Sequence, residues 1–234
     1  MKYLGRLTVG LLWIVLSTSI TAGTIWIEGD HGDAGATLDT AQMIHGHNDP
    51  LNAIRGHLSN IDGVDIFRIL ISHPGNFSAE VEPDPHSTST QVLPQFFLFD
   101  SSGSPIVGAL GFFVADATLP FGPKDPGYYF LAVDSIGHDP FFTKTNADGT
   151  EIEKPLFCPD STFADAWVPC KGAKKQQLDG FQGQVLPGTN TGAYEIFLTG
   201  VTAPNPEPES VILMLTGLAV VLTAARKKRR STTL

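Results

Sequence analysis

Glycine and proline interrupt this chain more often than a helical protein tolerates. The 234 residues include 24 glycines and 17 prolines, and both residue types destabilise the interior of a helix. The chain also contains 15 phenylalanines, which supply material for an apolar core. Because this composition is not that of a disordered chain, we expect a folded domain built from short strands.

Five apolar segments between these glycines and prolines have the length and pattern of β-strands. Val64–Ile71 is dense in β-branched and large apolar residues, and is bounded by Gly63 and Pro74. In Phe77–Glu82 apolar and polar side chains alternate, as in a strand with one wet face. The other three segments are Gln95–Asp100, Gly127–Val133 and Ala193–Val201. Short strands between turns predict an all-β fold, an antiparallel β-sandwich with long loops.

Charge is unevenly distributed along the chain. The formal net charge is −9, yet residues 23–208 contain 8 basic and 23 acidic side chains. An acidic surface repels the phosphates of nucleic acids, so we exclude nucleic acid as a partner. The acidic charge of the body would favour binding of divalent cations, but solubility outside the cell is the simpler explanation for it.

The first 22 residues resemble a secretory signal peptide. Lys2 and Arg6 form a basic start, Leu7–Leu16 is a short apolar run, and small or polar residues lead to a cleavage point after Ala22. A permanent N-terminal anchor is the alternative, but the apolar run is short for a hydrocarbon layer about 30 Å thick. We therefore expect an exported protein.

The C-terminal segment predicts a transmembrane helix. Val211–Ala225 is apolar apart from two threonines, and as a helix it would be about 22 Å long. A basic cluster follows that would reach the interface and stay on the cytoplasmic side: Arg226, Lys227, Lys228, Arg229 and Arg230. This arrangement leaves the body of the protein outside, anchored to the membrane.

The residues before this helix resemble a sorting signal. Pro206, Glu207 and Pro208, then the apolar helix and the basic end, are similar to the PEP-CTERM signal of Gram-negative bacteria. The resemblance implies recognition by an exosortase, a membrane enzyme, and a final place at a surface that produces exopolysaccharide. Asn205 stands where the family usually has Val. An ordinary single-span tail anchor is the alternative.

The middle of the chain resembles a second family. The segments GDAGATLDTAQ, IRGHLSNIDGVDIFRI, FFLFDSSGSPIV and PGYYFLAV are similar to the bacterial pre-peptidase C-terminal (PPC) domain and its relatives. The resemblance covers Glu28–Val133, with Tyr194–Val201 as a last strand, and implies a small secreted β-sandwich. Residues 135–190 depart from it and are expected to form a loop-rich insertion. The expected parts are a signal peptide at 1–22, a body at 23–203 and a sorting tail at 204–234.

The two cysteines of the chain are Cys158 and Cys170. In an exported protein such a pair predicts a disulfide. Closing a loop of this size contributes on the order of 3 kcal/mol in the chain-entropy picture. A metal site would need more ligands than two cysteines.

Four aspartates are candidate ligands for calcium: Asp30, Asp33, Asp62 and Asp65. They lie in a Gly-rich segment and beside the turn into a strand, and calcium takes six to eight oxygen ligands from such flexible segments. Turn capping by these side chains is the alternative. The histidines between His45 and His57 are interpreted as part of a loop rather than as a zinc or copper site, and no other cofactor is expected.

The sequence contains no nucleophile elbow, HExxH, P-loop or GxGxxG motif. We therefore expect a non-catalytic surface or extracellular-matrix protein, and the resemblances imply exosortase as a partner and exopolysaccharide as a candidate ligand. Trp167 and Tyr128 are candidate aromatics for stacking on sugars, with packing inside the fold as the alternative. A secreted hydrolase or protease accessory module is the second interpretation, because PPC-like domains accompany proteases.

Overall fold

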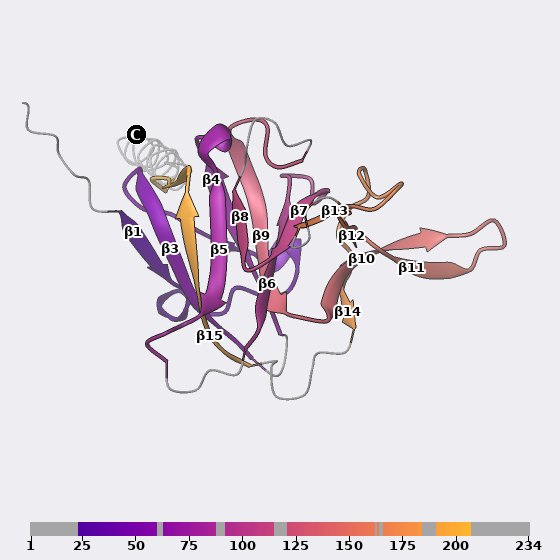
Figure 1. The fold of residues 1–234 in the computed structure, drawn as a ribbon, viewed down its shortest axis with the longest axis horizontal. Coiled ribbons are helices and arrows are strands. Elements are labelled where there is room, and N and C mark those ends of the chain that lie inside the picture. The colour runs from indigo at the N-terminus through magenta and orange to yellow at the C-terminus, as the bar shows by residue number, and fades with distance from the viewer. Residues whose placement is uncertain are drawn as a thin grey trace, which may run out of the picture.

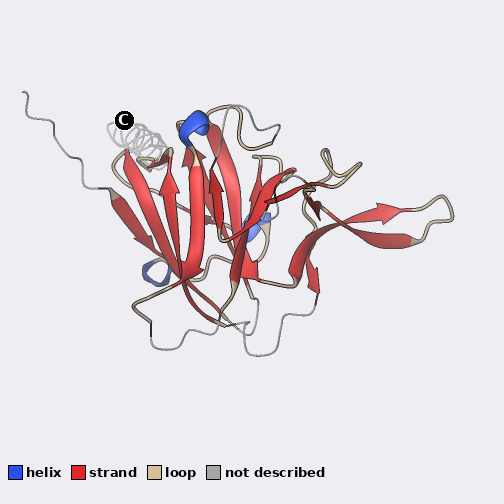
Figure 2. Ribbon diagram, in the orientation of Figure 1, coloured by secondary structure: helices blue, strands red, loops and turns tan. Residues whose placement is uncertain are grey.

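The computed structural model describes residues 23–59, 63–87, 92–114, 121–161, 163, 166–183 and 191–206. Within these ranges the chain is mainly strand, with three short 3-10 helices (Figures 1 and 2). The all-β class expected from the Gly- and Pro-punctuated sequence is therefore confirmed.

The elements follow one another closely along the chain. The strands are β1 (Thr24–Ile27), β2 (Gln42–Met43), β3 (Asp49–Leu58), β4 (Val64–Ile71), β5 (Ser78–Pro83), β6 (Pro94–Phe99), β7 (Pro105–Leu110), β8 (Phe112–Val114), β9 (Gly127–Ser135), β10 (His138–Thr145), β11 (Glu151–Pro155), β12 (Phe157–Pro159), β13 (Ala166–Pro169), β14 (Gly180–Gly183), β15 (Gly192–Thr199) and β16 (Val201–Ala203). The 3-10 helices are η1 (Glu28–Asp30), η2 (Leu38–Thr40) and η3 (Pro74–Asn76).

Most of these strands belong to one curled sheet. Its order is β12-β13-β7-β6-β9-β4-β16-β3-β15-β5-β8, and β1 and β2 add to it beside β3 and β4. All neighbours are antiparallel except the β1–β3 and β2–β4 pairs. The sheet continues from one half to the other through β16, which pairs with β3 on one side and β4 on the other. Strands β10, β11 and β14 form a small separate sheet that projects from the body (Figure 1).

The first hydrophobic core lies between the two halves of the curled sheet. On β4, Phe67 and Ile69 point into this core while Ile66 points to the opposite face, because successive side chains of a strand alternate. Ile196 of β15 meets them from the other half. Full burial of one such side chain stabilises the fold by roughly 1.5–3 kcal/mol.

A second core covers the outer face of β4, β6 and β9. Ile66 and Phe97 project from the sheet, and Leu156, Phe157 and Leu178 pack over them. The covering residues come from the region expected to be a loop-rich insertion, whose described part contains β10 to β14. Sequence reasoning underestimated this β-structure, because several of these strands are only three to five residues long and lack clear alternation.

The two aromatic side chains considered for sugar stacking make contacts within the fold. Trp167 is half-buried in the second core, edge-on to Phe97 with ring centroids 5.5 Å apart. Tyr128 lies under the Arg68 guanidinium, 4.5 Å from the ring centroid. Each contact favours the packing alternative for these residues.

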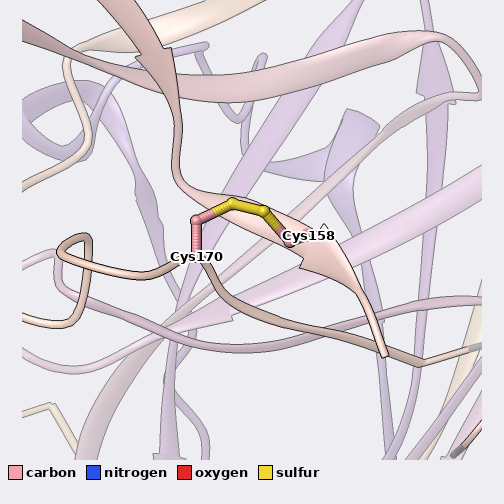
Figure 3. Close-up of a disulfide and its surroundings, with 2 residues drawn as sticks. All are labelled: Cys158 and Cys170. Carbon is pink, nitrogen blue, oxygen red and sulfur yellow. A yellow bond between two sulfur atoms is a disulfide. The ribbon is translucent and has the colours of Figure 1, made fainter. Parts of the chain in front are cut away.

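The expected disulfide joins Cys158 and Cys170 (Figure 3), with the sulfur atoms 1.96 Å apart. Cys158 lies in β12, and Cys170 directly follows β13, its antiparallel partner. The backbone N–H of Cys170 also donates to the carbonyl of Leu156 at 2.9 Å. The crosslink therefore closes the β12–β13 pair, and the hydrogen bond joins the end of the pair to Leu156, which covers the second core.

Among the described residues, no helix is long and apolar enough to cross a membrane. The expected signal peptide at 1–22 and the expected transmembrane helix at 211–225 both lie outside the described ranges.

Candidate metal centre

The carboxylate of Glu28 holds the chain where β1 ends. Its side chain is 5% exposed. Oε1 accepts the backbone N–H of Ala34 and Oε2 accepts that of His57, both at 3.0 Å. One side chain thereby fastens the segment after η1 to the middle of the sheet, and the two charge-assisted hydrogen bonds compensate part of the cost of burying it.

Tyr194 and Asp65 meet beneath Glu28. Both are fully buried, and the Tyr194 hydroxyl donates to Oδ2 of Asp65 at 2.6 Å. Asp65 comes from β4 and Tyr194 from β15, so the hydrogen bond links the two halves of the curled sheet. Gly56 gives them room, because a Cβ there would lie 2.3 Å from the Tyr194 hydroxyl and 2.7 Å from Oε2 of Glu28.

Asp33 completes a group of three carboxylates. Glu28, Asp33 and Asp65 each present a carboxylate oxygen within 4.8 Å of the others. Glu28 and Asp65 are buried, whereas Asp33 is exposed and connects the group to solvent. We name these three residues the acidic centre.

The acidic centre changes the proton affinity of Glu28 and of the neighbouring Tyr194. Burial raises the pKa of Glu28, and the Asp33 charge raises it further, while hydrogen bonds from His57, Ala34 and Asp65 oppose the shift. Burial, followed by the charges of Asp65 and Glu28, raises the pKa of Tyr194 well above its ordinary value. Tyr194 therefore remains a neutral hydrogen-bond donor in this setting.

Three carboxylates in one place can share a proton or bind a cation. Hard oxygen donors suit calcium, which takes six to eight of them, with backbone carbonyls and water completing the shell. Calcium would add positive charge to a group that carries none of its own. The chemistry of the donor set therefore fits the cation considered in the sequence analysis.

The structure brings together two of the four aspartates expected to bind calcium. Asp33 and Asp65 belong to the acidic centre; Asp30 is exposed and is not one of its three members. Asp62 lies outside the described residues. Glu28 was missed because it is 37 positions from Asp65 in the sequence and no local motif joins them.

A second group of candidate ligands lies at the end of β5. Asp84, His86 and Glu195 present ligand atoms within 4.8 Å of one another. Glu195 is already paired with Arg55, whose Nε donates to Oε1 at 2.9 Å. The neighbouring arginine charge makes this group a weaker candidate for a cation than the acidic centre.

The histidine-rich stretch after β2 packs against an aromatic ring. His45 lies edge-on to Trp26 at 5.1 Å between ring centroids, and His31 stacks on the same indole at 3.7 Å. His45 Nδ1 lies 3.3 Å from the Met43 carbonyl. His45 and His47 lie outside the strands, as the loop interpretation expects. His57 does not belong to this loop, because it lies in β3 and pairs with Ala193 of β15.

Of the expected sorting motif, only Pro206 is described; Glu207, Pro208 and the basic cluster Arg226 to Arg230 lie outside the described residues. The end of the described chain is held by Asn48, whose Oδ1 accepts the backbone N–H of Asn205 at 3.0 Å. No protein-family model and no curated protein matches this chain. Function must therefore be argued from its own residues and geometry.

Proposed function

We propose that this protein is an exported, non-catalytic surface or extracellular-matrix module, anchored by a PEP-CTERM tail and processed by an exosortase. The observation that carries the proposal is the position of the folded body. The described strands run from Thr24 to Ala203, between the expected cleavage point after Ala22 and the Pro-Glu-Pro motif that starts at Pro206. Along the sequence, both addresses thus lie beyond the first and last described strands, as a cleavable leader and a sorting tail require.

The disulfide supports export. Structural disulfides persist in oxidising compartments such as the periplasm and the cell exterior, and are rare in a reducing cytosol. The Cys158–Cys170 bond stabilises short strands with a small core of their own. A PPC-like β-sandwich outside the cell membrane is consistent with this requirement.

The sorting step is tested by mass spectrometry of the protein from cells with and without an exosortase. We expect loss of the mass after roughly Pro208 only when the enzyme is present. A Glu207→Ala variant should keep its tail, whereas Glu209→Ala, a matched change of a nearby acidic residue, should be processed normally. An intact tail in both strains would contradict processing and leave a plain membrane-anchored domain.

A groove beside β7 and β13 supports exopolysaccharide as the ligand. Its volume is about 410 Å³, within the range of about 300–1,000 Å³ common for small-molecule sites. Ile106, Phe121 and Val168 provide apolar walls. Lys124 and Lys174 add positive charge, and Asp160 adds one negative charge. In a body dominated by acidic side chains, a groove with two lysines and one aspartate favours an acidic sugar segment.

The ligand is tested by co-sedimentation of the protein with acidic and neutral polysaccharides. We expect retention by the acidic polymer that falls with rising salt, because exposed charges are screened. Lys174→Ala should weaken retention several-fold, and Lys144→Ala, an exposed lysine on β10, should not. Equal retention by both polymers, or equal effects of the two variants, would contradict this ligand assignment. Turnover of either polymer that a single substitution abolishes would favour the hydrolase alternative.

A further inference from the structure

A second buried polar cluster lies at the end of β9, on the face that carries the second core. Gln95 of β6 and Asp134 of β9 are paired in register, and their exposed fractions are 1% and 0%. The chain then turns through Gly137, and His138 begins β10 beside Asp134. His138 is about one-fifth exposed, so the cluster reaches solvent on that side.

The Gln95 amide has a defined orientation. Its Nε2 donates to the carbonyls of Ser135 and His138 at 3.4 and 3.2 Å, and it also lies 3.5 Å from Oδ1 of Asp139. With the amino group committed to these acceptors, Oε1 points elsewhere and has no hydrogen-bond partner among the described residues.

The His138 ring is oriented in the same way. It hydrogen-bonds the backbone of Phe181, and because its Nδ1 has no hydrogen-bond partner, Nε2 makes this bond as the donor. In the neutral ring Nδ1 then carries no proton, and its lone pair can accept a hydrogen bond or bind a metal ion. Burial lowers the pKa of His138, which favours this neutral form. Nδ1 lies 4.0 Å from Oδ2 of Asp134.

Four buried acceptor atoms on these three neighbouring residues therefore lack a donor. They are Oε1 of Gln95, Oδ1 and Oδ2 of Asp134, and Nδ1 of His138; none has a hydrogen-bond partner in the described part of the chain. Leaving buried polar atoms unsatisfied is costly, and a bare buried carboxylate is more costly still. Burial accordingly raises the pKa of Asp134 well above its ordinary value; the nearby Gln95 amide opposes the shift, and the neighbouring Asp139 charge adds to it.

A proton and a cation would satisfy this cluster to different extents. One proton on Asp134 supplies one donor and engages one other acceptor, which leaves the second carboxylate oxygen and either Nδ1 of His138 or Oε1 of Gln95 without a partner. A divalent cation accepts electron pairs from every member of the cluster at once. The observation that all four atoms are acceptors therefore favours the cation.

We propose that Asp134, His138 Nδ1 and Gln95 Oε1 form a binding site for a divalent cation of the zinc class. One imidazole nitrogen with oxygen donors suits such an ion better than calcium, which prefers oxygen ligands alone. Metal-binding histidines usually donate their second ring N–H to a carbonyl or carboxylate, as His138 does to Phe181. Bonds of about 2.0–2.2 Å to zinc would draw Nδ1 and Oδ2 together by roughly half an ångström.

This site shares no residue with the acidic centre and does not depend on the proposed sorting or sugar binding. Asp139 remains outside the three ligands and acts through its charge and its contact with the Gln95 amide. Solvent access past the His138 ring offers a path for the ion.

The test uses the full chain with its disulfide intact, stripped of metal with a chelator. Zinc binding is measured by titration calorimetry, and cobalt(II) is used as a spectroscopic substitute whose visible absorption reports nitrogen and oxygen ligation. We expect binding near one equivalent, with a zinc-dependent rise in melting temperature. Asp134→Asn and His138→Gln should each weaken binding at least roughly tenfold.

Two matched variants control for other sites. His73→Gln changes a histidine whose Nδ1 already contacts the Ser72 hydroxyl at 3.0 Å, and Asp33→Asn changes the acidic centre; both should bind zinc like the unaltered chain. Because His138 is partly exposed, its variant keeps the test valid if the Asp134 variant folds poorly. Absence of binding, or binding that survives both Asp134→Asn and His138→Gln, would overturn the proposal. A metal-independent gain in stability from Asp134→Asn, without zinc binding, would assign the cluster to a bound proton instead.

Discussion

Glu28 and Asp65 bring two carboxylates into buried positions, and Asp33 adds a third from the surface. Mutual repulsion and burial both oppose charge at this place. Hydrogen-bond donors from the backbone and from Tyr194 offset part of this cost. A bound calcium ion would add the positive charge that these donors do not supply.

Calcium should therefore raise the melting temperature of the metal-free protein. A ligand at 100 times its Kd stabilises the folded state by about 2.7 kcal/mol, which corresponds to several degrees for a domain of this size. Asp33→Asn should remove most of this rise, because it deletes a ligand without disturbing a buried side chain. Thermal melting with and without calcium measures the effect.

Asp30→Asn is the matched control, since Asp30 is also exposed and lies in the adjacent η1. It should melt like the unaltered protein, both with and without calcium. The calcium assignment fails if the melting curve of the unaltered protein does not respond to the ion. It fails equally if the two variants lose the response together.

Tyr129 predicts a change of stability at alkaline pH. Burial raises the pKa of Tyr129, its hydrogen bond to the Asp125 backbone opposes the shift, and the charges of Asp125 and Asp100 add to it. A raised pKa means that the folded state holds the phenol proton more tightly than the unfolded state. The resulting stability is fully present below the unfolded pKa of about 10 and is lost as the pH rises through the higher folded value.

Tyr129→Phe should lower the free energy of unfolding at pH 7 by roughly 0.5–1.5 kcal/mol, because it removes the hydrogen bond that the hydroxyl donates to the Asp125 carbonyl at 2.6 Å. It should also flatten the decline of stability above about pH 10. Denaturant unfolding between pH 7 and 11 measures both effects, with Tyr128→Phe as the neighbouring control. An unchanged slope in the Tyr129 variant would contradict the assignment.

At the scale of elements, turn chemistry explains why β6 and β7 form a hairpin. Oδ1 of Asp100 accepts the backbone N–H groups of Ser102 and Ser104 at 2.8 and 3.0 Å. Gly103 follows with a φ of 81°, a conformation that favours glycine. Aspartate, serine and glycine at these positions are typical of a tight turn.

The β12–β13 pair depends on its disulfide more than on its length. Each of these strands has only three or four residues, so the crosslink should contribute on the order of 3 kcal/mol. Reduction, or the Cys158→Ser/Cys170→Ser variant, should loosen the cover of the second core first. Trp167 lies in that core and Trp26 in the first core. Variants that keep only one of these two tryptophans, with Trp13 also replaced by Phe, can therefore report on each core during denaturation.

We expect the Trp167 signal to change at lower denaturant concentration after reduction, while the Trp26 signal shifts less. The oxidised Trp13→Phe/Trp26→Phe and Trp13→Phe/Trp167→Phe proteins, measured without reductant, provide the reference transitions. Identical transitions before and after reduction would show that the disulfide contributes nothing to this region.

At the scale of the whole molecule, the curl of the sheet produces both buried polar clusters. It carries Asp65 and Tyr194, 129 positions apart, to a hydrogen bond, and it leaves the outer face of β9 to be covered by the chain beyond β10. The acidic centre then lies on the inner face, whereas Gln95 and Asp134 lie on the outer face with the second core. The same sheet topology thus creates two separate clusters of buried polar side chains, each of which is a candidate cation site.

The sequence by itself determined the class of the fold and many of its strands. The prediction of Val64–Ile71 matches β4 residue for residue, and Gly127–Val133 matches most of β9. These patterns are local: alternation, β-branched residues and the glycines and prolines at the ends can be read within a few positions. The cysteine pair was equally readable, since it needs only composition and an oxidising compartment.

Only the tertiary structure decided which polar residues meet. Asp33 and Asp65 were candidates from the sequence. No sequence motif identifies Glu28, Tyr194, Gln95 or Asp134. Their partners lie on strands brought together by the curl of the sheet, and pairings across such distances leave no local period in the sequence. Burial then gives these groups their properties, because desolvation depends on what packs around a side chain and not on its neighbours along the chain.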